Sequence, residues 1–145
     1  MFCSLMQLNR RYYNDEDRAK MMADTRVHLE FVASLYVAQH DAGLLWLHEH
    51  PDRATSWQEE CMLELLAKEG VKRVTSDMCV FGMTVLQMDE ESGEKSEQLA
   101  VKPTGWATST DEIDKALNKR CDHAGRTAWQ QHRHARLFKR LGQEV

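Results

Sequence analysis

An uninterrupted apolar run meets a polar cluster in the stretch Leu44-Leu-Trp-Leu-His-Glu-His-Pro51. Four consecutive apolar residues, Leu44 to Leu47, are typical of a strand that is buried on both faces, as in parallel sheets. In open α/β sheets, ligands bind just beyond the carboxyl ends of such strands. The stretch therefore predicts an inner parallel strand at Leu44–Leu47 and a candidate site at His48–Pro51.

A helical pattern precedes this strand. Asn14 is suited to cap the N-terminus of a helix that begins at Asp15 and continues to about Gln39. Apolar residues recur along it at steps of three and four, and Phe31 and Leu35 widen the apolar stripe. We therefore expect this helix to bury a broad face, with Phe31 and Leu35 included.

A second helix and a second strand follow. Ser56-Trp-Gln-Glu59 has the form of a capping box, which predicts the start of a helix, and Val71–Thr75 has the composition of a strand. The order helix, strand, helix, strand is the repeating unit of an α/β domain with a parallel sheet. The resulting prediction is a Rossmann-like arrangement.

The rest of the chain adds a hairpin and a last helix. Met83–Met88 and Gln98–Val101 flank a polar loop, which predicts an antiparallel hairpin at one edge of the sheet, and Ser109-Thr-Asp-Glu112 offers another capping box. The predicted fold is thus an α/β, partial Rossmann-like three-layer domain with a short parallel sheet. It covers residues 1–120, and a basic C-terminal segment follows at 121–145.

Composition narrows the class of protein. The 145 residues, with 23 acidic and 19 basic side chains, fit one globular domain, and the small numbers of Gly and Pro argue against collagen-like or disordered chains. No apolar run is long enough to span a membrane, so no membrane partner is expected. The four cysteines lack a C-x-x-C pair, which favours reduced thiols and an intracellular location, in the cytoplasm or the nucleus.

Basic residues concentrate near the C-terminus. From Lys115 to Arg140 there are eight Lys or Arg and one acid, a net charge of +7, which leaves −11 for the other residues of a chain whose total is −4. Such a segment, with Trp129 inside it, is typical of a surface that contacts DNA or RNA. An alternative is that it pairs with acidic groups of this chain or of a partner. The predicted phosphate contacts are Arg133, Arg136, Lys139 and Arg140.

The polar cluster could carry chemistry. A carboxylate at Glu49, flanked by the imidazoles of His48 and His50, could have its pKa displaced by burial and could hold or donate a proton. The alternative is structural. In it, the two imidazoles form hydrogen bonds at the strand end and Glu49 faces water.

Several motifs together resemble a known family. His48-Glu-His-Pro51, Asp77-Met-Cys-Val-Phe-Gly82 and Lys102-Pro-Thr-Gly-Trp106 resemble methyltransferase-like segments of retroelement (Pol-type) polyproteins, which are distantly similar to DNA cytosine-5 methyltransferases. The resemblance implies a mobile-element origin and a role for Glu49 in contacting a flipped cytosine. It further implies a substrate-binding surface that includes His48, His50, Trp57, Lys102 and Thr104. Lys102 could equally be an ordinary edge-strand lysine beside Pro103.

The catalytic parts of that family are missing from this sequence. There is no G-x-G turn for S-adenosylmethionine, and neither proline precedes a cysteine, so no Pro-Cys nucleophile exists. The chain is expected to be only the C-terminal half of such a domain. It would therefore bind no cofactor by itself, and S-adenosylmethionine only when a missing N-terminal half is supplied as a partner.

Four residues near the C-terminus invite a zinc interpretation. Cys121, His123, His132 and His134 have ligand chemistry, but their spacing matches no standard zinc finger. A helix through Trp129 would also direct His132 and His134 to different sides. No metal is predicted, and these four remain weak candidates.

Two functions remain as hypotheses. The first is a truncated or degenerate methyltransferase-like domain that is inactive alone, and the second is a non-catalytic nucleic-acid-binding module that uses the basic C-terminal segment. They differ in their dependence on S-adenosylmethionine.

We expect the purified chain to transfer no labelled methyl groups from S-adenosylmethionine to DNA, because both the glycine turn and the nucleophile are missing. A thermal-shift assay is the companion measurement, since a ligand at about 100 times its Kd stabilises a protein by about 2.7 kcal/mol. Methyl transfer that Glu49→Gln abolishes would contradict this prediction.

Overall fold

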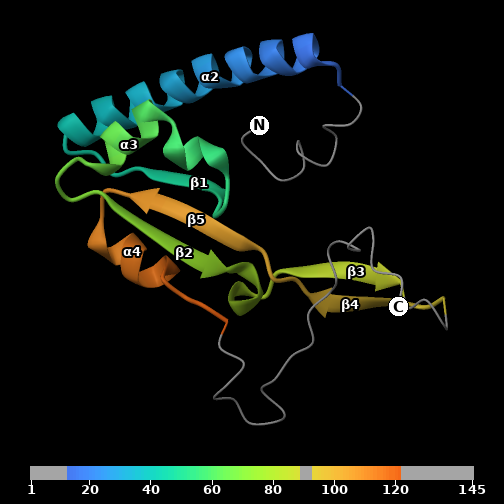
Figure 1. The fold of residues 1–145 in the computed structure, drawn as a ribbon. Coiled ribbons are helices and arrows are strands. Elements are labelled where there is room, and N and C mark those ends of the chain that lie inside the picture. The colour runs from blue at the N-terminus through green and yellow to red at the C-terminus, as the bar shows by residue number, and fades with distance from the viewer. Residues whose placement is uncertain (1–12, 89–92, 122–145) are drawn as a thin grey trace.

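The structure is a computed structural model, and it describes residues 13–88 and 93–121. Helices lie on both sides of a small sheet, and a separate hairpin extends from it (Figure 1). In chain order the elements are α2 (Asp15–Asp41), β1 (Leu47–Pro51), the 3-10 turn η2 (Thr55–Gln58), α3 (Glu60–Leu66), β2 (Lys72–Asp77), the 3-10 turn η3 (Met78–Phe81), β3 (Thr84–Met88), β4 (Lys95–Leu99), β5 (Pro103–Thr108) and α4 (Asp111–Leu117).

The main sheet has the order β1-β5-β2, and both of its pairings are antiparallel. The prediction of a Rossmann-like domain with a parallel sheet is therefore wrong. β1 and β2 do run in the same direction and are joined through η2 and α3, as in a β-α-β unit. However, β5 lies between them in the opposite direction, which makes the unit a split one.

The prediction of a strand at Leu44–Leu47 is also wrong, because the strand begins only at Leu47. Leu44 and Leu45 are 57% and 68% exposed. The start of the apolar run belongs to the end of α2. The N–H of Gly43 donates to the carbonyl of His40, and the N–H of Leu44 donates to that of Gln39, as in a Schellman motif with its glycine at positive φ.

The alternation of side chains gives the sheet two different faces. The strand pairing aligns His48 of β1, Arg73 of β2 and Ala107 of β5 in one row across the sheet. This row lies on the face that α2 and α3 cover. The opposite face carries Glu49, Trp106 and Val74 in one row, and α4 packs on this side (Figure 1).

The hydrophobic core lies between the sheet and the helices α2 and α3. Its buried residues are Leu29, Ala33, Trp46, Ala54, Trp57, Met62, Leu65 and Ala107. Trp57 occupies the middle of this layer, and its indole N–H donates to the carbonyl of Pro51 at 2.9 Å. The ring lies over Gly105, where a Cβ would be 2.9 Å from the nearest ring carbon. Gly105 is thus the position in β5 that makes room for Trp57.

Local helix signals have mixed outcomes. Asn14 caps α2 as expected, since its side chain accepts a hydrogen bond from the N–H of Asp17. Thr110, and not Ser109, caps α4. The capping box at Ser56 is wrong, because Thr55–Gln58 form a 3-10 turn and α3 starts at Glu60 with no side-chain cap.

The outer face of α2 also departs from expectation. Phe31 and Leu35, which were expected to face the core, are 60% and 49% exposed. The buried residues of this helix, Leu29 and Ala33, point to the opposite side. Apolar residues occur on both sides of α2, so its periodicity alone does not identify the packed face.

The expected hairpin is present, with Thr84 opposite Leu99 and Met88 opposite Lys95, but its second strand is Lys95–Leu99 and not Gln98–Val101. The two strands form a separate two-stranded sheet, however, and not an edge of the main sheet. Among the helices of residues 13–88 and 93–121, none is both long and apolar enough to cross a membrane.

We predict that Gly105→Ala destabilises the fold by about 1–3 kcal/mol, because the added methyl group would collide with a buried ring that a hydrogen bond holds in place. Urea unfolding measures this change. The control is the same substitution in a Trp57→Leu background, where the cost should be smaller. An equal cost in both backgrounds would contradict the prediction.

Candidate functional site

The structure places His48 and His50 on the inner face of β1. His48 is 7% exposed and lies edge-on against Tyr36 and Trp57, at centroid distances of 5.5 and 5.3 Å. Its ring stacks on that of His50, which is half-buried, at 5.8 Å. Three aromatic neighbours thus surround His48, and Trp57 is itself part of the core.

This environment favours a neutral imidazole. Burial, followed by the nearby His50, lowers the pKa of His48 to about 4. Its Nε2 atom is buried without a hydrogen-bond partner. His48 is therefore uncharged at neutral pH and contributes to packing more than to charge.

Glu49 lies on the other face of β1, so the structure does not place it between the two imidazoles. The carboxylate is about half exposed and pairs with Nζ of Lys102 at 3.4 Å. Thr104 is buried, and its hydroxyl donates to the carbonyl of Lys102. Of the residues expected to bind substrate, only Lys102 thus lies beside Glu49 with an accessible polar group.

A polar cluster that the sequence did not suggest lies beside Trp57. The guanidinium of Arg73 stacks over the indole at 4.6 Å and donates to the carboxylate of Asp52 at 3.0 Å. The same carboxylate accepts a hydrogen bond from the hydroxyl of Thr75 at 2.6 Å. Asp52 follows β1, whereas Arg73 and Thr75 belong to β2. The cluster therefore links the two outer strands across β5, and only the strand order could have revealed it.

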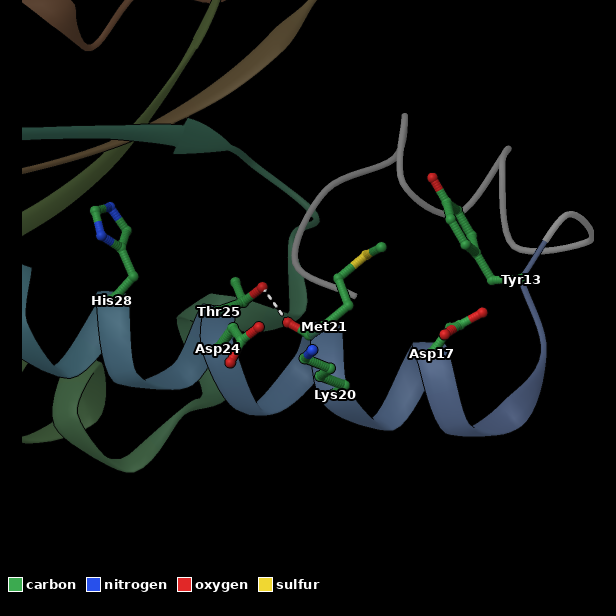
Figure 2. A pocket seen from close by; sticks show the side chains of 7 residues that line it. All are labelled: Tyr13, Asp17, Lys20, Met21, Asp24, Thr25 and His28. Carbon is green, nitrogen blue, oxygen red and sulfur yellow. Dashed lines mark hydrogen bonds between the residues drawn. The ribbon is translucent and has the colours of Figure 1, made fainter.

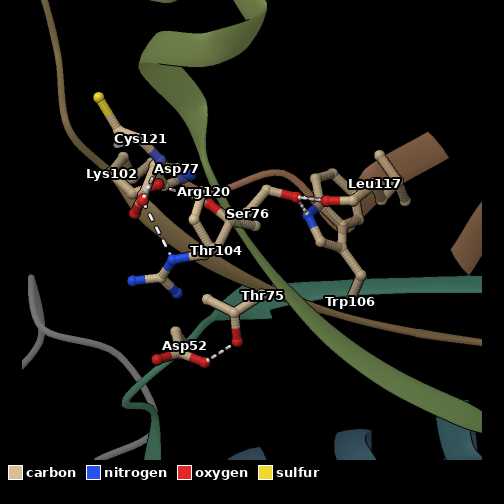
Figure 3. A network of polar contacts seen from close by, with 10 residues as sticks. All are labelled: Asp52, Thr75, Ser76, Asp77, Lys102, Thr104, Trp106, Leu117, Arg120 and Cys121. Atoms are coloured by element: carbon tan, nitrogen blue, oxygen red, sulfur yellow. Dashed lines mark hydrogen bonds and ion pairs between the residues drawn. The ribbon is translucent and has the colours of Figure 1, made fainter. Parts of the chain in front are cut away.

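A second polar network surrounds Asp77 at the end of β2 (Figure 3). The carboxylate of Asp77 is 5% exposed, accepts from the N–H of Cys121 at 2.8 Å and pairs with Nε of Arg120 at 3.1 Å. The N–H of Asp77 donates to the carbonyl of Lys119. Three consecutive residues that follow α4 are therefore held by one aspartate.

The adjacent Ser76 strengthens the same attachment. Its hydroxyl donates to the carbonyl of Leu117, the last residue of α4, and accepts from the indole N–H of Trp106 at 2.9 Å. Ser76 is fully buried. Together, Ser76 and Asp77 fix the end of α4 and the first residues after it to the edge of the sheet.

Cys79 and Cys121 lie near this network as thiols and not in disulfides. Burial raises the pKa of the Cys79 thiol to about 11, and a hydrogen bond with the side chain of Cys121 acts in the same direction. Such a thiol is a poor nucleophile at neutral pH.

Within the described ranges no cluster of three possible metal ligands occurs. Three zinc candidates, His123, His132 and His134, lie outside the described residues, as do Arg133, Arg136, Lys139 and Arg140.

A hollow lies along the N-terminal half of α2, and its lining residues are not arranged as in an active site (Figure 2). Apart from Tyr13, which precedes the helix, its lining comes from that one helix. The hydroxyl of Thr25 bonds to the carbonyl of its own helix at Met21. The lining groups thus belong to one face of one element, and they do not converge on a common point from several elements, as active-site groups usually do.

Comparisons with protein-family models, with curated proteins and with solved structures find no match to this chain.

We predict that the protein loses stability as the pH falls through the window from about 6.5 to about 4, because the unfolded chain binds a proton at His48 there and the folded chain does not. The loss should be on the order of 2 kcal/mol, and His48→Phe should remove it. Urea unfolding at about pH 7 and about pH 4.5 measures the difference. His28→Phe, at an exposed position of α2, is the control and should keep the pH dependence. Equal pH slopes in the wild type and in His48→Phe would refute the assignment.

Proposed function

We propose that this chain is a non-catalytic nucleic-acid-binding module in which the sheet supports the basic segment Lys115–Arg140. The observation that carries the proposal is the attachment at Asp77. One buried carboxylate holds Arg120 and the N–H of Cys121, the last two residues of the segment that the structure describes. The described part of the segment, Lys115 to Cys121, is therefore held in a fixed position.

A fixed start of the basic segment favours binding to nucleic acid. A chain that is ordered before it meets its partner loses less conformational entropy on association. Lys115 and Lys119 are held with α4 and the residues after it. Phosphate contacts made by these first cations would orient the remaining ones along the nucleic-acid backbone.

The charge distribution supports the same function. The segment carries +7 while the remaining residues sum to −11, so cations are concentrated at one end of the chain. A cation cluster of this size displaces condensed counterions from nucleic acid, which gives affinity without sequence specificity. The competing role, in which the segment pairs with acidic groups of this chain or a partner, is an outcome of the test below.

The described residues favour binding over catalysis. The expected general acid or base, Glu49, is half exposed and paired with Lys102, and the imidazoles lie on the other face of the strand. The thiol of Cys79 is buried with a raised pKa. A methyltransferase-like origin stays a prediction from the sequence. We also propose an intracellular location, with the thiols of Cys61, Cys79 and Cys121 in support.

Replacing Arg133, Arg136, Lys139 and Arg140 with Ala should weaken binding to all sequences alike. If each cation neutralises one phosphate, the slope of log K against log salt should become less steep by up to about 3.6 on duplex DNA. Fluorescence anisotropy over a salt series measures both effects.

The matched control removes four cations elsewhere, by substituting Ala for Lys20, Arg26, Arg53 and Lys95, all of them exposed. It lowers the net charge equally and should leave the slope nearly unchanged. Two results would overturn the proposal: a wild-type chain that binds no DNA or RNA at low salt, or equal losses in the two variants.

A further inference from the structure

We infer that Phe81 is a stacking platform for an unpaired base, so that the preferred partner of this module is single-stranded nucleic acid. The inference rests on the proposed function and specifies its partner. It starts from an exposed aromatic ring beside the root of the basic segment.

Phe81 is 42% exposed, the most exposed residue of the turn that carries it. Cys79 of the same turn, η3, is buried at 4% exposure. The turn therefore directs one apolar side chain inward and leaves a large ring in contact with water. Exposed rings in this setting are used by single-strand-binding proteins, because every base has a face on which it can stack.

The backbone holds this ring in a fixed place. Gly82 ends η3 in a left-handed conformation with φ of 81°, and its N–H donates to the carbonyl of Cys79. The N–H of Met78 donates to the carbonyl of Lys102, which directly precedes β5. This bond joins the start of the turn to the main sheet. A platform that is rigid before binding costs less entropy when a base stacks on it.

A cation lies over one face of the ring. Nζ of Lys119 is 5.5 Å from the centroid of Phe81, and the carbonyl of Lys119 accepts the N–H of Asp77 at 3.0 Å. Arg120 follows, paired with the carboxylate of Asp77. The ammonium of Lys119 lies over one face of the ring, so a base would stack on the other face. A ring and an ammonium in contact match the two parts of a nucleotide, since the ring suits the base and the ammonium suits the phosphate.

This arrangement discriminates between single strands and duplexes. In a duplex both faces of each base are covered by neighbouring bases, whereas an unpaired base can turn outward and stack on a protein ring. The phosphate contacts of the basic segment act on both forms. Phe81 would therefore add affinity for single strands alone.

The test compares a labelled oligothymidine of about 12 nucleotides with a duplex of equal length, by fluorescence anisotropy at low salt. Phe81→Ala should weaken binding to the single strand by about 5- to 150-fold, which corresponds to about 1–3 kcal/mol for one stacked base, and should leave duplex binding unchanged. Phe81→Trp should keep or strengthen single-strand binding, and a variant with another exposed apolar residue removed, Leu86→Ala on β3, should behave as wild type.

The outcomes separate this inference from the proposed function. If the wild type binds both nucleic acids and Phe81→Ala weakens neither, or weakens both equally while Phe81→Trp does not restore binding, the stacking platform is refuted and the basic segment remains the binding element. If the wild type binds neither nucleic acid, the proposed function itself fails. Selective loss of single-strand binding in Phe81→Ala, with recovery in Phe81→Trp, supports the inference.

Discussion

The antiparallel pairing of β5 with both β1 and β2 is the constraint on which the rest of the structure depends. β1 and β2 are edge strands of a three-stranded sheet, and each reaches the other only through β5. β5 also carries the small residues Gly105 and Ala107 on its inner face, and Trp57 fills the space above Gly105. The strand thus sets both the sheet order and the depth at which Trp57, one of two buried core tryptophans, can lie.

The same strand decides how the chemical groups are distributed. Because side chains alternate along β1, Glu49 lies on one face of the sheet and the imidazoles of His48 and His50 on the other. These three residues are therefore neighbours in the sequence, yet the carboxylate lies on a different face of the sheet from the two imidazoles. By contrast, Asp52 and Arg73, which are 21 residues apart, meet because β1 and β2 both flank β5 and the long side chain of Arg73 extends from the row of His48 and Ala107 to the carboxylate of Asp52.

Local features of this fold could be predicted from the sequence, and long-range features could not. The cap at Asn14 and the glycine turn at Gly43 depend on a few neighbouring residues, whose conformational preferences are strong. The strand order depends on which distant segment pairs with β1. A short apolar run such as Leu44–Leu47 contains no information on that choice, and its first residues instead complete the end of α2.

The candidate site shows the same division. The basic segment is visible in the sequence because charge is a property of composition, but its attachment is not. Asp77 is the last residue of β2, an edge strand, and the N–H of the next residue, Met78, points toward the carbonyl of Lys102. Since successive N–H groups of a strand alternate in direction, that of Asp77 points to the open edge, where the carbonyl of Lys119 accepts it.

An edge strand left open would expose unpaired backbone groups that other chains could pair with. Here the residues after α4 use part of that edge, and the buried carboxylate of Asp77 holds them there through Arg120 and Cys121. The sheet thereby gains cover at an exposed edge while the basic segment gains a fixed origin. One attachment thus satisfies part of the edge of the sheet and holds Lys119, Arg120 and Cys121 in place, so under the proposed function the sheet and the start of the binding segment would depend on the same few hydrogen bonds.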